Sequence, residues 1–185
     1  MRLEIDWLKE NHQMIHFFGL GFIQLKIDPY TRLHFYTTKF SPIVADDSAH
    51  NHRYDFISHI LFGELKQYLY LFKEDPLGQY VLEQEACQEG AEPSPTKRTG
   101  DLIEQSAKSY GPGGSYTLLS SEFHKVEARQ DTITYLLRGH QTKTLADVIR
   151  HKDSEKVCPF SKKISETDLW LIVDEMIKNR NIQLA

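Results

Sequence analysis

Short runs of aromatic and aliphatic residues constrain the fold of this chain more than any other feature of its sequence. Aromatic residues make up 11% of the chain, and most of them stand in runs bounded by turn signals, a pattern typical of β-strands. Asp28-Pro29, Gly63-Glu64 and Asp75–Gly78 are such signals. We therefore expect an all-β fold of roughly ten strands, arranged as a sandwich or barrel. The expected strands include Phe22–Ile27, Leu33–Thr38, Phe56–Leu61, Leu65–Phe72, Tyr80–Gln84, Leu102–Ala107, Ser115–Leu119, Phe123–Glu127 and Thr132–Leu137.

Three details of this pattern lead to further expectations. Every residue from Tyr68 to Phe72 is suited to burial, so we expect the strand Leu65–Phe72 to be covered on both faces. The turn Ala128–Asp131 is expected to join its neighbouring strands as a hairpin. Residues 85–99 contain two prolines, one glycine and charges of both signs, which indicates an exposed loop between two strands.

Helices are expected only at the two ends. Asp6 is a candidate N-cap for a helix that runs to about His16. Ser165–Asp168 resembles a capping box and opens an amphipathic helix, which we expect to cover a sheet. Leu169, Ile172, Val173, Met176 and Ile177 form its apolar stripe. We expect one domain over residues 1–185, with a barrel core at about 20–140 and a C-terminal helical appendage at about 141–185.

Composition excludes several classes of protein. The 22 Lys and Arg against 26 Asp and Glu give a net charge of −4, so no overall positive field attracts nucleic acid. No stretch reaches the roughly 18 apolar residues of a membrane span. Two cysteines cannot form a disulfide scaffold and fit a reducing compartment. Because the first residues also lack the apolar core of a signal peptide, we expect a soluble cytoplasmic protein.

His50-Asn51-His52 is the strongest candidate for a functional motif. On an extended strand, residues i and i+2 point to the same face with Cα atoms roughly 6–7 Å apart, so two imidazoles can converge on one ion. His124 is the candidate third ligand. The alternative is that His50 and His52 are half-buried structural residues bonded to backbone carbonyls.

These histidines resemble the ligands in the first of the two motifs of the cupin family, G-x5-H-x-H-x3,4-E-x6-G. The segment HNHRYDFISHILFG matches it at His50, His52 and Gly63. Val44 stands where the motif has its leading glycine, and Phe56 stands where it has its glutamate ligand.

The second cupin motif, G-x5-P-x-G-x2-H-x3-N, is matched by GGSYTLLSSEFHKVEA at Gly113 and His124. Leu119, Ser121 and Ala128 replace its proline, second glycine and asparagine. The resemblance implies a double-stranded β-helix (jelly-roll) barrel, with His50, His52 and His124 as metal ligands and no carboxylate among them.

Three neutral imidazoles suit Fe(II), Zn(II), Ni(II) or Cu(II). Within the cupins, this ligand set is similar to that of the thiol dioxygenases, whose motifs are matched by HNH, LFGEL (61–65) and HKVE (124–127). That likeness implies a mononuclear site, with Fe(II) as the first expectation and Zn or Ni as alternatives. Residues 33–140 are also similar to uncharacterised bacterial and phage cupins, which bring no known reaction.

Other residues are candidates for binding or catalysis. The thiol-dioxygenase likeness implies a catalytic tyrosine near the end of 132–138, where Tyr135 and Arg138 stand. Arg53, Asp55 and Tyr36 are candidate substrate-binding residues, since such groups anchor anionic or hydroxylated molecules. Asp55 has two further readings, as an additional metal ligand or as an acceptor that orients Arg53 or a ligand imidazole.

His59 has the opposite parity to Phe56 on the expected strand. If Phe56 points inward, His59 points to the other face of the sheet, and we interpret it as a structural histidine.

The function that these expectations favour is an Fe(II)-dependent oxygenase (a dioxygenase-like oxidoreductase) acting on a small molecule. A Zn or Ni enzyme of the cupin type, catalysing isomerisation, lyase chemistry or hydrolysis, is the first alternative. A cupin that binds a small ligand without catalysis is the second. We expect a small-molecule substrate and no nucleic-acid or membrane partner. The cupin resemblance implies that a homodimer can form through edge strands.

Overall fold

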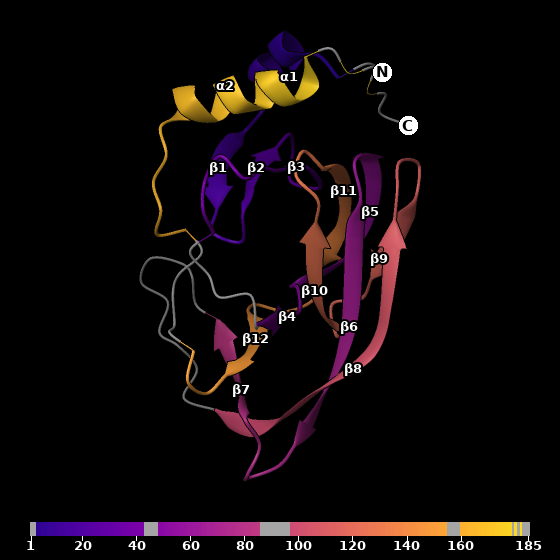
Figure 1. The fold of residues 1–185 in the computed structure, drawn as a ribbon, viewed down its shortest axis with the longest axis vertical. Coiled ribbons are helices and arrows are strands. Elements are labelled where there is room, and N and C mark those ends of the chain that lie inside the picture. Colours follow the sequence, from indigo (N-terminus) through magenta and orange to yellow (C-terminus); the bar gives the residue numbers. More distant parts are fainter. Residues whose placement is uncertain are drawn as a thin grey trace.

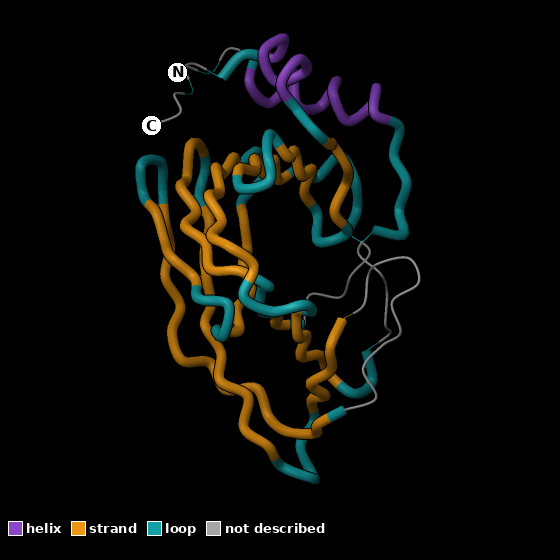
Figure 2. Tube along the Cα trace, turned by 180° about the vertical axis from the view of Figure 1, so that it is seen from behind, coloured by secondary structure: helices purple, strands orange, loops and turns teal. Residues whose placement is uncertain are grey.

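The structure is a computed structural model of the chain. It describes residues 3–42, 48–85, 97–154, 160–178, 180 and 182. Most of the loop expected at residues 85–99, and the Val44 position of the first motif, lie outside these ranges. Figure 2 shows that strands form most of the described body, with the helices at one end.

Six antiparallel strands form a sheet in the order β1-β2-β3-β11-β5-β9. Backbone hydrogen bonds join each strand to the next one in this order. The two central strands, β11 and β5, are nine residues long. The strands are β1 (Met14–Phe18), β2 (Phe22–Lys26), β3 (Thr31–Tyr36), β11 (Ile133–Gln141), β5 (Tyr54–Phe62) and β9 (Ser115–Leu118).

The other six strands close into a barrel in the order β10-β4-β12-β7-β8-β6. β6 and β8 are its longest strands and run side by side down the molecule (Figure 1). β6 pairs with both β8 and β10 and so completes the ring of strands. The strands are β10 (Phe123–Ala128), β4 (Ala49–His50), β12 (Ala146–His151), β7 (Tyr80–Glu85), β8 (Arg98–Tyr110) and β6 (Leu65–Glu74).

Two of the turns that connect the sheet to the barrel, the β5–β6 turn and the β10–β11 turn, pack on each other. Gly63 connects β5 to β6 at φ +80°, and a Cβ there would lie 2.4 Å from Oγ1 of Thr132. Thr132 Oγ1 accepts a hydrogen bond from the backbone N–H of Glu64 (3.1 Å) and donates one to the Glu64 carbonyl (2.9 Å). The hairpin predicted at 128–131 is therefore wrong, because β10 lies in the barrel and β11 in the sheet.

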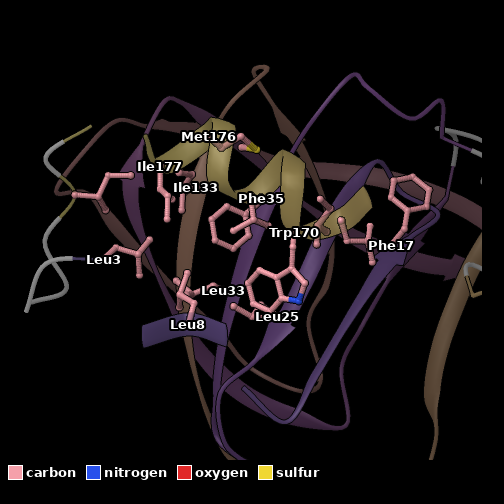
Figure 3. Packing of buried hydrophobic residues seen from close by; sticks show 14 residues of the cluster. Leu3, Leu8, Phe17, Leu25, Leu33, Phe35, Ile133, Trp170, Met176 and Ile177 are labelled. Atoms are coloured by element: carbon pink, nitrogen blue, oxygen red, sulfur yellow. The ribbon is translucent and has the colours of Figure 1, made fainter. Parts of the chain in front are cut away.

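The helices α1 (Ile5–Asn11) and α2 (Glu166–Ile177) cover the outer face of the sheet. Their apolar side chains pack against β1, β2, β3 and β11, as Figure 3 shows. Ser165 caps α2 as predicted, since its hydroxyl accepts a hydrogen bond from the Asp168 N–H (3.1 Å). This core includes Leu8, Phe17, Ile23, Leu25, Leu33, Phe35, Ile133, Leu169, Trp170, Val173, Met176 and Ile177.

A second core lies between the sheet and the barrel. Its members come from β5, β9 and β11 on one side and from β6, β8 and β10 on the other. The alternation of burial along β5 places every second residue from Tyr54 in this core. The buried members are Tyr54, Phe56, Ile60, Leu65, Tyr116, Leu118 and Leu136.

Three sequence expectations need correction. The first helix ends at Asn11 rather than near His16, because Met14–Phe18 pairs with β2 as strand β1. The barrel core was expected to end at about residue 140, with a helical appendage from about 141, but Ala146–His151 forms β12 and completes the barrel. β6 is not covered on both faces, since its second half is largely exposed, including Leu71 at 52%.

The fold is thus all-β, with a closed barrel and a helix near each end, as predicted and as a cupin-like barrel requires. Of the helices in the described ranges, none has the length and apolar character needed to cross a lipid bilayer.

Candidate metal centre

Three histidine side chains meet beside the second core. One ligand nitrogen from each of His50, His52 and His124 can be chosen so that all three lie within 4.8 Å of one another. The ring centroids are separated by 4.8, 4.9 and 5.0 Å. The predicted convergence of these three side chains is therefore confirmed.

Strand register brings His50 and His124 together. β4 and β10 are antiparallel neighbours, and His124 lies directly opposite His50; Figure 1 shows the two strands side by side. β4 is two residues long and ends at His50. The extended strand expected for the motif therefore stops there, and His52 reaches the site from the connection between β4 and β5.

Asn51 fixes this connection. Its side chain donates a hydrogen bond to the Asp147 carboxylate (2.8 Å) and accepts one from the Asp147 backbone N–H (2.7 Å). Its own backbone N–H donates to the Asp147 carbonyl (3.0 Å). These three bonds tie the residue between the two histidines to β12, so the direction of both imidazoles is set by the barrel.

Burial keeps all three imidazoles neutral at physiological pH. It lowers the pKa of His50 to about 4. Burial is also the main reason that the pKa values of His52 and His124 lie well below 6.5, with a further contribution from the neighbouring histidines. Each neutral ring carries one nitrogen lone pair, which is the form that binds a metal ion.

Aromatic rings cover the side of the histidines that faces the sheet. Phe56 on β5 has its ring centroid 4.9 Å from that of His52 and 5.9 Å from that of His124. Tyr54, two residues earlier on the same face, lies 5.7 Å from His52. The residue at the place of the cupin glutamate therefore contributes an apolar ring to the site and no ligand.

The donor set fits a divalent transition metal. Nε2 of His52 and Nε2 of His124 are 2.9 Å apart, and two ligands at right angles on an ion with bonds of about 2.1 Å lie about 3.0 Å apart. His124 Nδ1 is buried, and it has no hydrogen-bond partner among the described residues. Three imidazoles without a carboxylate suit Fe(II), Zn(II), Ni(II) or Cu(II).

Two of the predicted binding residues lie on the face of the sheet turned toward the histidines. The Arg138 guanidinium carbon is 4.7 Å from the centroid of the Tyr54 ring. Tyr36 packs against the second core, and burial raises its pKa well above the usual value. Arg53 directly follows His52 and is partly buried, and its carbonyl accepts a hydrogen bond from the Thr142 N–H (2.7 Å).

The structure places the other predicted residues on the opposite face. Tyr135 packs against the core under the helices, with its ring 6.3 Å from His59. His59 thus points away from Phe56, as expected. Asp55 Oδ1 accepts a hydrogen bond from the Ser120 N–H (2.6 Å), and this bond lowers its pKa. Neither Tyr135 nor Asp55 is brought to the three histidines.

Sequence reasoning missed a set of polar residues on the inner face of the sheet. Register places His16 opposite Gln24, Gln24 opposite His34, and His34 opposite Thr134. The neighbouring row contains Lys26 opposite Arg32. The signal was present in Thr31–Tyr36, where the polar residues alternate with Leu33 and Phe35, but it belongs to no recognised motif.

Comparison with known proteins identifies no family for this chain. No protein-family model matches the chain, and no curated protein is similar enough to count as a relative.

Proposed function

We propose that this protein is a cupin-type metal-dependent enzyme, an Fe(II) oxygenase of a small molecule, with His50, His52 and His124 as the protein ligands of the iron. The observation that carries the proposal is the neutral three-imidazole cluster, in which His124 is buried and His50 and His52 are partly buried. Among the described residues no carboxylate joins this cluster, and Phe56 takes the place of the cupin glutamate. This donor set matches the motif resemblance to the thiol dioxygenases.

Fe(II) held by His50, His52 and His124 would supply the redox chemistry for the oxidation of a small molecule by oxygen. The chain itself supplies the surroundings. Asn51 holds the two histidines of β4 and its connection in place through Asp147. Phe56 and Tyr54 exclude water from one side of the imidazoles. Arg138 places a positive charge above Tyr54, where it attracts an anionic part of the substrate.

The test is oxygen uptake by protein loaded anaerobically with Fe(II), supplied with a panel of small thiols and organic acids. We expect substrate-dependent oxygen consumption that is lost in His52→Ala. The matched control is His59→Ala, which removes a histidine from the opposite face of β5 and retains uptake.

Two outcomes would contradict the oxygenase proposal. Turnover by the Zn(II)- or Ni(II)-loaded protein without oxygen would assign isomerase, lyase or hydrolase chemistry to the same ligands. Undiminished ligand affinity in the double variant His50→Ala/His52→Ala, with no turnover under any metal, would leave a non-catalytic binding protein.

A further inference from the structure

Three cationic side chains, Lys26, Arg32 and Arg138, lie on the inner face of the sheet, and Arg53 stands in the connection that leads to β5. The guanidinium carbons of Arg32 and Arg138 lie 5.1 and 4.7 Å from the centroid of the same ring, Tyr54. Lys26 is opposite Arg32 in the β2–β3 register. Burial lowers the pKa of Lys26, and the positive charges of Arg32, Arg138 and Arg53 lower it further. We refer to Lys26, Arg32, Arg53 and Arg138 as the cationic cluster.

No carboxylate balances the cationic cluster within the part of the chain that the structure describes. None of its members forms a salt bridge there. Other partly buried cations are paired, for example Arg150 with Glu83 at 2.9 Å and Arg180 with Asp131 at 3.0 Å. Because buried charges are normally paired, an unbalanced group of four requires an explanation.

Two hydrogen-bond donors of the cluster are also without a partner among the described residues. Nε of Arg32 and Nε of Arg138 are buried and have no hydrogen-bond partner among the described residues. Buried donors without a partner are rare in folded proteins and mark places where a water or ligand completes the site. Two guanidinium groups side by side present forked N–H donors, which match the oxygens of a carboxylate or phosphate.

The cluster lies close to the histidines. Tyr54, which both arginines contact, has its ring 5.7 Å from the His52 ring. Arg138 is opposite Phe56 in the β11–β5 register, and Phe56 contacts His52 and His124. Tyr54 and Phe56 therefore connect the two arginines to the imidazoles.

We propose that Arg32 and Arg138, with Lys26 and Arg53 beside them, bind a doubly charged oxyanion of the substrate, such as a phosphate ester or a dicarboxylate. The inference deepens the proposed function and rests on it, since it names the substrate class of the same site. A single carboxylate would neutralise one charge of four. A dianion neutralises two and offers enough oxygens to accept hydrogen bonds from both guanidinium groups.

The experiment measures anion binding to metal-free protein by calorimetry at low ionic strength. Inorganic phosphate and malonate are the doubly charged probes, and acetate is the singly charged comparison. We expect phosphate or malonate to bind at least about tenfold more tightly than acetate. We expect Arg32→Gln and Arg138→Gln each to weaken that binding by about tenfold or more, because each removes a charge-assisted hydrogen bond. The control Arg98→Gln, an exposed arginine paired with Glu74 on the barrel, should bind as the wild type does.

Thermal unfolding separates ligand binding from a structural role. Since like charges repel, Arg138→Gln should raise the melting temperature of the anion-free protein. Phosphate should raise the melting temperature of the wild type and leave that of Arg32→Gln/Arg138→Gln unchanged. A lower melting temperature for the anion-free variants would show that these arginines stabilise the fold, and would overturn the proposal.

Two further results would overturn it. One is equal affinity for acetate and phosphate. The other is anion binding that survives both arginine substitutions but disappears in His50→Ala/His52→Ala, which would place the anion at the imidazoles. Metal content of the same variants keeps the two proposals distinguishable. Arginine-dependent anion binding in a protein that takes up no metal would support the anion site and refute the oxygenase.

Discussion

Lowering the pH should destabilise the metal-free protein steeply, because the buried His34 and the partly buried His16 are neutral imidazoles on the inner face of the sheet. Burial lowers the pKa of His16 to about 4 and that of His34 to about 3, with the positive charge of Arg32 contributing to both. His34 is 8% exposed and lies 3.1 Å from the Gln24 side-chain nitrogen. Neither nitrogen of His16 has a partner in the described structure.

The sign and size of the effect follow from these pKa values. In the unfolded chain both histidines take up protons near pH 6.5, but in the folded chain they remain neutral until the pH is well below 5. The two histidines therefore cost the fold no stability above pH 6.5. As the pH falls below that value, the unfolded chain takes up protons that the folded chain does not, and the free energy of unfolding decreases. Between pH 7.5 and 5.0, each histidine removes about 2 kcal/mol from the free energy of unfolding.

Urea unfolding at pH 7.5 and pH 5.0, followed by tryptophan fluorescence in the presence of a chelator, measures this loss. His34→Gln keeps a polar side chain beside Gln24 but cannot titrate, so its loss of stability should be smaller than that of the wild type by about 2 kcal/mol. His140→Gln, at an exposed position of β11, should behave as the wild type does. Equal losses in wild type and His34→Gln would refute the conclusion that His34 is buried in its neutral form.

Three further substitutions test local features of the site and its frame. Asn51→Ala should lower stability by about 1–3 kcal/mol and weaken metal binding by about 10–100-fold in a chelator competition, because both bonds of its side chain to Asp147 are lost; unchanged affinity would show that this contact does not orient the histidines. Asp55→Asn should leave metal content unchanged by elemental analysis, since Asp55 bonds to Ser120 on the other face of β5, and loss of the metal would contradict that placement. Gly63→Ala should lower the melting temperature, at a cost of about 1–2 kcal/mol or more, because φ is +80° and the new Cβ meets Thr132; an unchanged melting temperature would refute this reading of the turn.

The sequence predicts strands where apolar periodicity decides them and fails where pairing decides them. The expected bounds of β5 and β2 are close to the observed ones, because the apolar residues of these strands mark the buried positions in the sequence. β1 and β12 were expected as helix or helical appendage. The local pattern of Gln13–His16 continues the helix, and strand forms only because β2 offers a partner at that edge. This is a tertiary effect that a local window does not contain.

The candidate site divides in the same way. The spacing of His50 and His52 and the motif position of His124 predicted the cluster. In the structure the cluster forms because β4 and β10 are neighbours, with His124 opposite His50. The face on which Tyr135 and Asp55 lie was not predictable without knowing which residues of β11 and β5 point inward. Arg32 carried no motif, and its importance comes from contacts to Tyr54 on a different strand.

Elemental analysis after anaerobic reconstitution with Fe(II) measures directly whether the three histidines bind iron, with untagged wild type beside His124→Ala and His59→Ala. We expect close to one iron per chain in wild type and in His59→Ala, and loss of iron in His124→Ala. Zinc or nickel retained in place of iron, and lost in His124→Ala, would keep the ligands and refute the oxygenase. Equal metal content in His124→Ala and wild type, or none in either, would contradict a metal centre at these three histidines.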